Sequence, residues 1–491
     1  MSLDFNKIKP WSEMIRCNMA DDENSPSAYF GDSWYNEDGY KDDGITQVQT
    51  YVEMPMFWYR RYKDIPSSEL ANAISFRPKA GFDLHETFKR PDGIKTKIYV
   101  GAFLASFYDV SREEYSDYYK GNATPNTNGN GDPDRTTPVV AVVSGDTIND
   151  VADKIRAAES AFPAYTLGGT DAEVTFLCKT NGAKTTPAWG SAKQGVDGSW
   201  SVVSAGDDDN PASFTLTVTN GATSTGNVNI GIDQYTGFAP NTAATTGDKL
   251  SSIAGRFPLT KLTRAQFRQM ARNRGEKFSE IDITTWSAIQ LLQMIELGSL
   301  DGQTALGMGV TNKTAYTYYK AEKTGTTAYT LEDPNYGEAT GLYHMMYRGI
   351  EDFWGNCWQF IDGININFTT VSATADTPIP YWCNDITLYA DDTTTNYEDM
   401  GIVLSGYPSI GGYGYIKNIH TNPDWSFLPS EHQSAAGYFR DYWYPSSTAG
   451  WRVLRGGGSW TYGGLDGPWA LSALTSSATA YLSDGGRLQR V

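Results

Sequence analysis

The sequence predicts an α+β protein that is rich in loops and short strands, has two helices in its main domain and is interrupted by a small inserted α+β module. Glycine (49 residues) and tyrosine (31 residues) are abundant, which is typical of turn-rich folds and of surfaces that recognise other molecules. Short runs of β-branched and aromatic residues lie between turn formers, a pattern typical of strands. Helical periodicity is confined to a few segments.

Residues 1–49 are acidic and aromatic, with Asp21–Glu23 and Asp42–Asp43 among Ser, Gly and Tyr. Their hydrophobic periodicity is weak, so we expect an irregular arm with short strands. Such an arm could attach the protein to a larger assembly, or it could wrap around the next domain. The sequence leaves both alternatives open.

The first part of the main domain spans residues 50–121, where Val52–Tyr59 and Ile98–Phe103 have the composition of strands. The stretch Gly121–Arg135 consists largely of Gly, Asn, Thr, Pro and Asp, and it cannot bury a core. We therefore expect a linker there.

An inserted module of residues 135–237 follows, which we expect to act as a spacer or adhesion module. Its helix is predicted over Asp146–Ala161 from apolar residues at helical spacing, with Thr147 or Asp146 as the N-cap. The predicted strands are Pro138–Val143, Glu173–Cys178, Ser201–Ser204, Ser213–Val218 and Val228–Ile232.

The main domain resumes at residues 245–491 with two further predicted helices. Thr263–Arg274 begins with a capping box of Thr263 and Gln266 and is followed by Gly275. Thr284–Leu297 is followed by Gly298. From Gly302 onward the sequence predicts loops and short strands and no helix.

Charge and composition exclude several classes of partner. The net charge is −18, whereas binding to nucleic acid or to an anionic membrane needs a basic surface. No apolar run is long enough to span a membrane and no signal peptide is recognisable, so we expect synthesis in a bacterial cytoplasm. The four cysteines lack CxxC spacing and the four histidines lack metal-site spacing, so neither a metal nor a cofactor is expected. These residues are Cys17, Cys178, Cys357, Cys383, His85, His344, His420 and His432. A calcium-binding loop is also not recognisable.

Two segments stand out as candidates for function. Residues 347–364 combine Trp354, Trp358 and Phe360 with Gly and Asn, which indicates a tight aromatic core. Residues 456–486 contain only two charges, Asp466 and Asp484, and consist mainly of small residues with interspersed Trp and Tyr. This is the composition of a binding surface of the antibody type. A glycine-rich pair of terminal strands without a ligand is the alternative.

The ordered motifs carry a resemblance to a known family. The chain contains RGIEDFWGN from Arg348, then FLPSE from Phe427, WRVLRGGGSW from Trp451 and GGRL from Gly485. This order resembles the C-type-lectin-fold variable proteins that are diversified by diversity-generating retroelements, especially receptor-binding proteins of phage and prophage tails in gut bacteria. Their fold is related to that of formylglycine-generating enzymes. The resemblance covers residues 50–121 and 245–491.

The resemblance implies a rigid scaffold that displays a variable C-terminal region at about residues 456–486. The scaffold motif would comprise Trp354, Gly355, Asn356, Trp358, Gly457, Ser459, Trp460, Gly486 and Arg487. The ligand-binding residues would be Thr461, Tyr462, Leu465, Asp466, Trp469, Ser472, Leu474, Tyr481 and Ser483. Trp469 would be a fixed member, because adenine-directed mutagenesis in this family does not produce Trp.

The resemblance also implies partners and location. The expected ligand is a protein or glycan of the host-cell surface, and the N-terminal region would contact other phage tail proteins. The protein would be a homotrimer in the virion, without nucleic-acid binding or membrane insertion. Two alternatives remain: a formylglycine-generating type of oxidase, and a purely structural tail or baseplate protein. The oxidase is disfavoured because such enzymes need reactive cysteines near the C-terminal motif, and no cysteine follows Cys383.

Overall fold

The computed structural model describes the chain in sixteen stretches, and every structural statement below concerns these residues: 3–63, 70–110, 114–116, 139–162, 165–181, 187, 194–206, 211–230, 232, 247–260, 262–313, 321–329, 339–371, 376–407, 412–481 and 483–491. The predicted linker Gly121–Arg135 lies outside them. Strands account for 36% and helices for 14% of the described residues, so the protein is a β-rich α+β protein with several antiparallel sheets. Two compact units divide it: unit 1 is Met1–Asp117 with Thr245–Val491, and unit 2 is Tyr118–Ala244.

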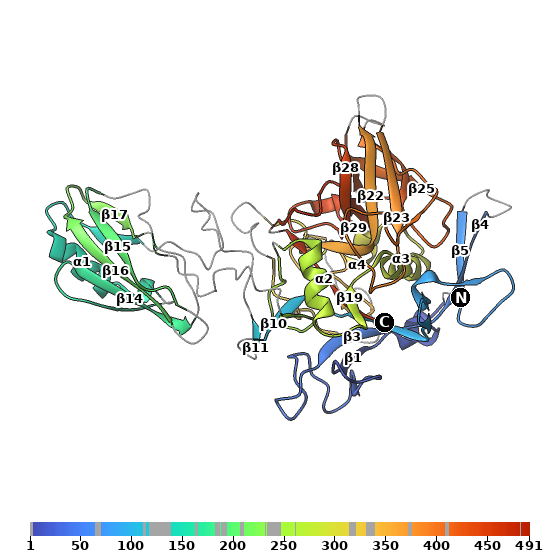
Figure 1. Ribbon diagram of the computed structural model, residues 1–491, viewed down its shortest axis with the longest axis horizontal. Helices are drawn as coiled ribbons and strands as arrows, with labels where there is room; N and C mark the ends of the chain where they lie inside the picture. Colours follow the sequence, from blue (N-terminus) through green and yellow to red (C-terminus); the bar gives the residue numbers. More distant parts are fainter. Residues whose placement is uncertain are drawn as a thin grey trace. The chain divides into compact units, whose positions relative to one another are not determined.

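Unit 2 is a small α+β module in which one helix packs on an antiparallel sheet (Figure 1). Helix α1 (Ile148–Ala157) begins at the N-cap Thr147, which forms a capping box with Asp150. Its apolar face buries Val151, Ala152 and Ile155 against the sheet. The four-stranded sheet has the order β13 (Tyr165–Gly168), β14 (Glu173–Asn181), β16 (Pro211–Asn220), β15 (Asp197–Ser204), and β12 (Val139–Val142) pairs with β17 (Gly226–Asn229). The helix and strands predicted for this segment are confirmed, with shifted ends.

Unit 1 contains a six-stranded antiparallel sheet that joins the two ends of the chain. Its order is β19 (Phe278–Glu280), β31 (Leu488–Arg490), β9 (Lys97–Gly101), β3 (Gln49–Pro55), β1 (Arg16–Met19), β2 (Ala28–Tyr29). Residues 1–49, for which the sequence left open an attachment arm or a wrap around the next domain, supply β1 and β2 and bury Trp11 and Met14 in the main core. They are therefore part of unit 1.

The predicted strand Val52–Tyr59 is wrong as a single element. It divides into β3 and β4 (Trp58–Lys63), because Pro55 has no amide N–H to continue the ladder. Smaller sheets complete this half of the unit: β4 with β5 (Leu70–Ser75) and β6 (Asp83–Leu84); β7 (Lys89–Arg90) with β8 (Gly93–Ile94); and β10 (Ser106–Asp109) with β11 (Glu114–Ser116) and β18 (Lys249–Ser251).

The helices of unit 1 begin and end largely where their caps predict. Helix α2 (Arg264–Arg272) has the capping box of Thr263 and Gln266, although its C-cap is Asn273 and Gly275 lies beyond it. Helix α3 (Ile283–Leu297) ends at Gly298, whose φ of 60° is left-handed. The expectation of no helix after Gly302 is wrong, because Asp301 caps the short helix α4 (Gly302–Leu306). None of the helices among the described residues is both long and apolar enough to cross a bilayer.

A nine-stranded sheet forms the other half of unit 1 and places the C-terminal segment at its centre (Figure 1). Its order is β24 (Glu398–Asp399), β23 (Asp376–Trp382), β22 (Trp358–Val371), β28 (Gly450–Gly457), β29 (Gly467–Ser472), β27 (Tyr442–Tyr444), β25 (Gly414–Ile419), β26 (Pro429–Gln433), and β30 (Asp484–Gly485) pairs with β22. A short hairpin of β20 (Met346–Tyr347) and β21 (Ile350–Glu351) precedes β22. The core beneath contains Trp286 of α3, Phe353 and Trp354.

Candidate functional site

The nine residues of the proposed scaffold motif are all buried. Trp354 donates from its indole Nε1 to the backbone oxygen of Gly307 at 3.2 Å. The guanidinium of Arg487 donates to the backbone oxygens of Gly101, Glu351 and Asp352 at 2.7–2.8 Å. These contacts tie the last strand to the aromatic segment 347–364 and to the six-stranded sheet, so the motif forms one rigid base.

Two glycines of this base have no room for a side chain. Gly457 has a φ of 89°, and a Cβ there would lie 2.8 Å from the backbone oxygen of Phe353. Gly458 has a φ of 82°, and a Cβ there would overlap the carboxyl group of Asp466. Close approach and left-handed backbone both require glycine, so this turn holds the following loop in one place.

The loop after the turn is the exposed part of the tail. Thr461 is exposed, as are Tyr462 (39%) and Tyr481 (54%), which lies shortly before β30. Leu465, Leu474 and Ser483 are half-buried. These six of the nine predicted ligand-binding residues are accessible to a partner.

The other three predicted residues are buried, and their assignment as ligand-facing is corrected: Asp466, Trp469 and Ser472. Strand β29 lies between β28 and β27 inside the nine-stranded sheet, and all of its residues, together with the preceding Asp466, are buried. Trp469 packs against Phe427 and Phe439 with ring centroids 5.0 and 5.5 Å away. The composition of the tail did not distinguish its strand from its loops.

Tyr462 belongs to a cluster of rings that the sequence analysis missed. Its ring contacts Trp358 and Tyr444, each with centroids 5.7 Å apart. The ring contacts continue through neighbouring strands and loops, and Tyr481 is joined to the cluster through Arg455, which lies over its ring. Trp358 and Tyr444 are the buried members. We call the whole set the tyrosine surface: Trp358, Tyr407, Tyr413, Tyr415, Tyr442, Tyr444, Tyr462 and Tyr481. A sequence signal existed, because Tyr413 and Tyr415, and likewise Tyr442 and Tyr444, are two positions apart and share one face of an extended chain.

The charges under the tyrosine surface are internally compensated. Arg455 pairs with Asp484 at 2.5 Å and donates to Ser472 at 3.0 Å. The Arg455 guanidinium lies over the ring of Trp358 at 5.3 Å and that of Tyr481 at 6.0 Å. Burial raises the pKa of Asp466 well above its ordinary value, and the nearby Asp441 adds to the shift. Burial therefore favours the neutral form of the Asp466 carboxyl group, and the surface above it offers rings and hydroxyl groups.

A cavity of about 810 Å³ borders the exposed loop on its α4 side. Asp301, Gln303, Thr304, Met308, Arg440 and Gly464 are among the residues that line it. A Cβ built on Gly464 would have only one neighbour within 4 Å, the Oε1 atom of Gln303 at 3.9 Å. A larger side chain at this position could project into the cavity without displacing the scaffold.

A buried cluster of His344, Glu351 and Asp352 was also missed, although all three lie within residues 344–352. Their ligand atoms lie within 4.8 Å of one another, so they could hold a metal by distance alone. However, His344 Nδ1 is 2.7 Å from Asp352 Oδ2. Although burial opposes protonation, the two carboxylates raise the pKa of His344 to about 9. In the absence of a metal, the protonated imidazole of His344 forms an ion pair with Asp352, and this pair stabilises the base of the site.

The four cysteines are buried, and none of them forms a disulfide. Burial raises the pKa of the thiols of Cys17, Cys357 and Cys383. Because the thiolate is the reactive form, these side chains are poorly suited to nucleophilic or redox chemistry.

Comparison of the chain with models of protein families and with curated proteins finds no match.

Proposed function

We propose that this chain is the receptor-binding protein of a phage tail, a non-enzymatic variable protein with a C-type-lectin-like fold of the kind related to formylglycine-generating enzymes. One observation carries the proposal. The exposed residues of the tail join tyrosines of two other segments into one surface, and this surface stands on a buried base of Gly, Trp and Arg. The order of the sequence motifs supports the same assignment.

The chemistry of the tyrosine surface fits recognition of a protein or glycan on a host cell. Tyrosine offers a large apolar ring with few rotatable bonds and a hydroxyl group at its edge, so it contributes contact area at a low entropic cost. Both ligand classes bind through such rings and hydroxyl groups. The ion pair of Arg455 with Asp484 and the raised pKa of Asp466 avoid a strong electrostatic preference.

The division of the tail into buried and exposed parts fits diversification. Substitutions at the six accessible positions change groups that a partner meets but leave the base in place: Thr461, Tyr462, Leu465, Leu474, Tyr481 and Ser483. As in the proposed family, we expect the protein to be a homotrimer in the virion, bound to other tail proteins through its N-terminal region. Three weak sites then add up to tight attachment through avidity.

Binding of the labelled full-length protein to a panel of gut bacteria tests the proposal. We expect Tyr462→Ala combined with Tyr481→Ala to weaken attachment to the recognised strain at least tenfold, since two tyrosine anchors of about 1–2 kcal/mol each are removed. Phe76→Ala removes an exposed aromatic side chain elsewhere in unit 1 and serves as the matched control. If the variant with both tyrosines replaced attaches as well as the Phe76→Ala control, a structural tail protein is the better explanation.

The formylglycine-generating alternative is disfavoured by a specific observation: the cysteines are buried, and the pKa of three of them is raised. Turnover of a cysteine-containing sulfatase peptide that Cys383→Ser abolishes would favour this enzyme instead.

A further inference from the structure

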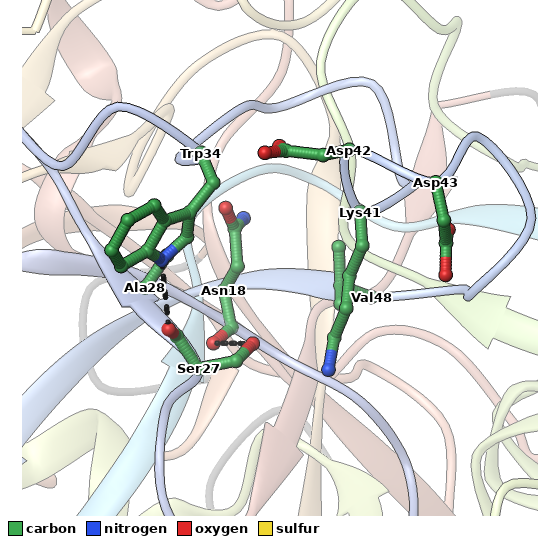
Figure 2. Close-up of a pocket in the computed structure, with 8 residues that line it drawn as sticks. All are labelled: Asn18, Ser27, Ala28, Trp34, Lys41, Asp42, Asp43 and Val48. Atoms are coloured by element: carbon green, nitrogen blue, oxygen red, sulfur yellow. Dashed lines mark hydrogen bonds between the residues drawn. The ribbon is translucent and has the colours of Figure 1, made fainter.

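A small pocket lies at the edge of the six-stranded sheet, in the N-terminal segment. Strand β2 is the edge strand, and the loops that follow it return to β3. The pocket has a volume of about 260 Å³ and is lined by Asn18, Ser27, Ala28, Trp34, Lys41, Asp42, Asp43 and Val48 (Figure 2). Sites for small molecules typically have roughly 300–1,000 Å³, so this pocket is of the size for a single side chain.

One wall of the pocket is an exposed tryptophan in a fixed orientation. The side chain of Trp34 is 52% exposed, although large apolar side chains are usually buried. Its indole Nε1 donates to the backbone oxygen of Ser27 at 3.1 Å, which anchors the ring at the pocket. Figure 2 shows Trp34 on one side of the pocket and Asp42 and Asp43 on the other, with Asn18 between them. An aromatic face opposite carboxylates is the arrangement that receives a cation.

Most of the polar groups around the pocket already have partners. The amide of Asn18 bonds the backbone N–H and oxygen of Asn36 at 3.0 and 2.7 Å. The ammonium of Lys41 pairs with Glu23 at 2.6 Å, and Asp43 accepts from the backbone N–H groups of Ile45 and Thr46. The side chain of Asp42 is exposed and has no hydrogen bond or ion pair with any part of the chain that the structure describes.

The surroundings favour a positively charged partner. Residues 1–49 contain ten acidic residues against four basic ones, and the whole chain has a net charge of −18. An anionic ligand would therefore be repelled, whereas a basic segment would be attracted over a distance of several ångströms. Ile45, which is 81% exposed on the neighbouring loop, adds an apolar contact of the kind found in protein interfaces.

We propose that this pocket binds an arginine side chain presented by a second protein, with the guanidinium stacked on Trp34 and paired with the carboxylate of Asp42. Arginine fits better than lysine, because its planar group stacks on an aromatic face and donates two parallel hydrogen bonds to a carboxylate. This inference does not depend on the proposed function. It assigns to the N-terminal segment a recognition site of its own, apart from the tyrosine surface.

Titration of the full-length protein with the blocked tripeptide Gly-Arg-Gly, followed by NMR of the peptide, tests the proposal. We expect saturable binding that weakens as salt is added. The same peptide with citrulline in place of arginine keeps the shape but lacks the charge, and we expect it to bind at least threefold more weakly. Trp34→Ala and Asp42→Asn should each raise the Kd by about threefold to tenfold.

Asp22→Asn is the matched control, because it removes one exposed acid from the same segment but outside the pocket. We expect it to leave the Kd within about twofold of the wild-type value, as expected for a distant surface charge. Should Trp34→Ala disturb the loop, Asp42→Asn still decides, since Asp42 supports no other group. The proposal is overturned if the arginine peptide does not bind, if the citrulline peptide binds equally well, or if both pocket variants bind like the wild type.

Discussion

The segments 347–364 and 456–486 both combine glycine with tryptophan and tyrosine, but they differ in burial. Every residue of the first segment is buried in the base of unit 1. The second alternates: the turn at 456–460 and strand β29 are buried, whereas residues 461–465 and much of 474–483 reach the surface. The difference teaches that composition alone does not define a binding surface. Strand order decides which parts of a glycine-rich segment a partner can touch.

The largest effect is expected from the fully buried segment. Trp354→Ala should lower the free energy of unfolding by about 3–5 kcal/mol, because the cavity left by the indole remains largely unfilled. Tyr462→Ala in the exposed loop should lower it by only about 0.5–1.5 kcal/mol, the contribution of its ring contacts with Trp358 and Tyr444. Urea denaturation of the two variants measures both changes in the free energy of unfolding. Similar losses in the two would remove the distinction between the segments.

The same contrast between buried and exposed positions is expected for substitutions of the glycines in the tail. Gly457→Ala forces a side chain against the oxygen of Phe353 in a left-handed backbone, and we expect a loss of about 1–3 kcal/mol. Gly464→Ala should be nearly neutral, because its surroundings are open. Thermal unfolding of this pair is the measurement, and an equal decrease in Tm would mean that the exposed loop is as constrained as the turn beneath it.

A smaller effect is expected in how the free energy of unfolding depends on pH, because Asp466 lies in the buried part of the tail. The pKa of Asp466 is raised in the folded protein, so its contribution to stability is fully present below the unfolded pKa of about 3.9 and is lost as pH rises toward and through the folded pKa. Asp466→Asn cannot ionise. Its unfolding free energy should therefore fall less steeply with pH than that of the wild type, by up to about 1.4 kcal/mol per pH unit. Parallel pH profiles would contradict a neutral buried carboxyl group.

The sequence predicted those features that depend on neighbours along the chain. Thr263 with Gln266 and the glycine at 298 fix helix boundaries locally, so α2 and α3 were found with small errors. Burial of the tail's β29 was not predictable, because its neighbours β27 and β28 come from separate segments. The tyrosine surface likewise depends on how strands pair across the sheet, whereas the cluster of His344, Glu351 and Asp352 is local to residues 344–352. Signals between neighbouring residues therefore predict the helices and strands, whereas the binding surface can be located only once the order of the strands is known.

The most direct test compares two libraries of variants made in the full-length protein. One library randomises the accessible positions Thr461, Tyr462, Leu465, Leu474, Tyr481 and Ser483, and the other randomises the buried positions Asp466, Trp469 and Ser472. The fraction of soluble, cooperatively unfolding variants is measured in each. We predict that most members of the first library fold and that few members of the second do. Equal fractions in the two libraries would contradict the claim that a rigid buried base permits free change at the exposed part of the tail.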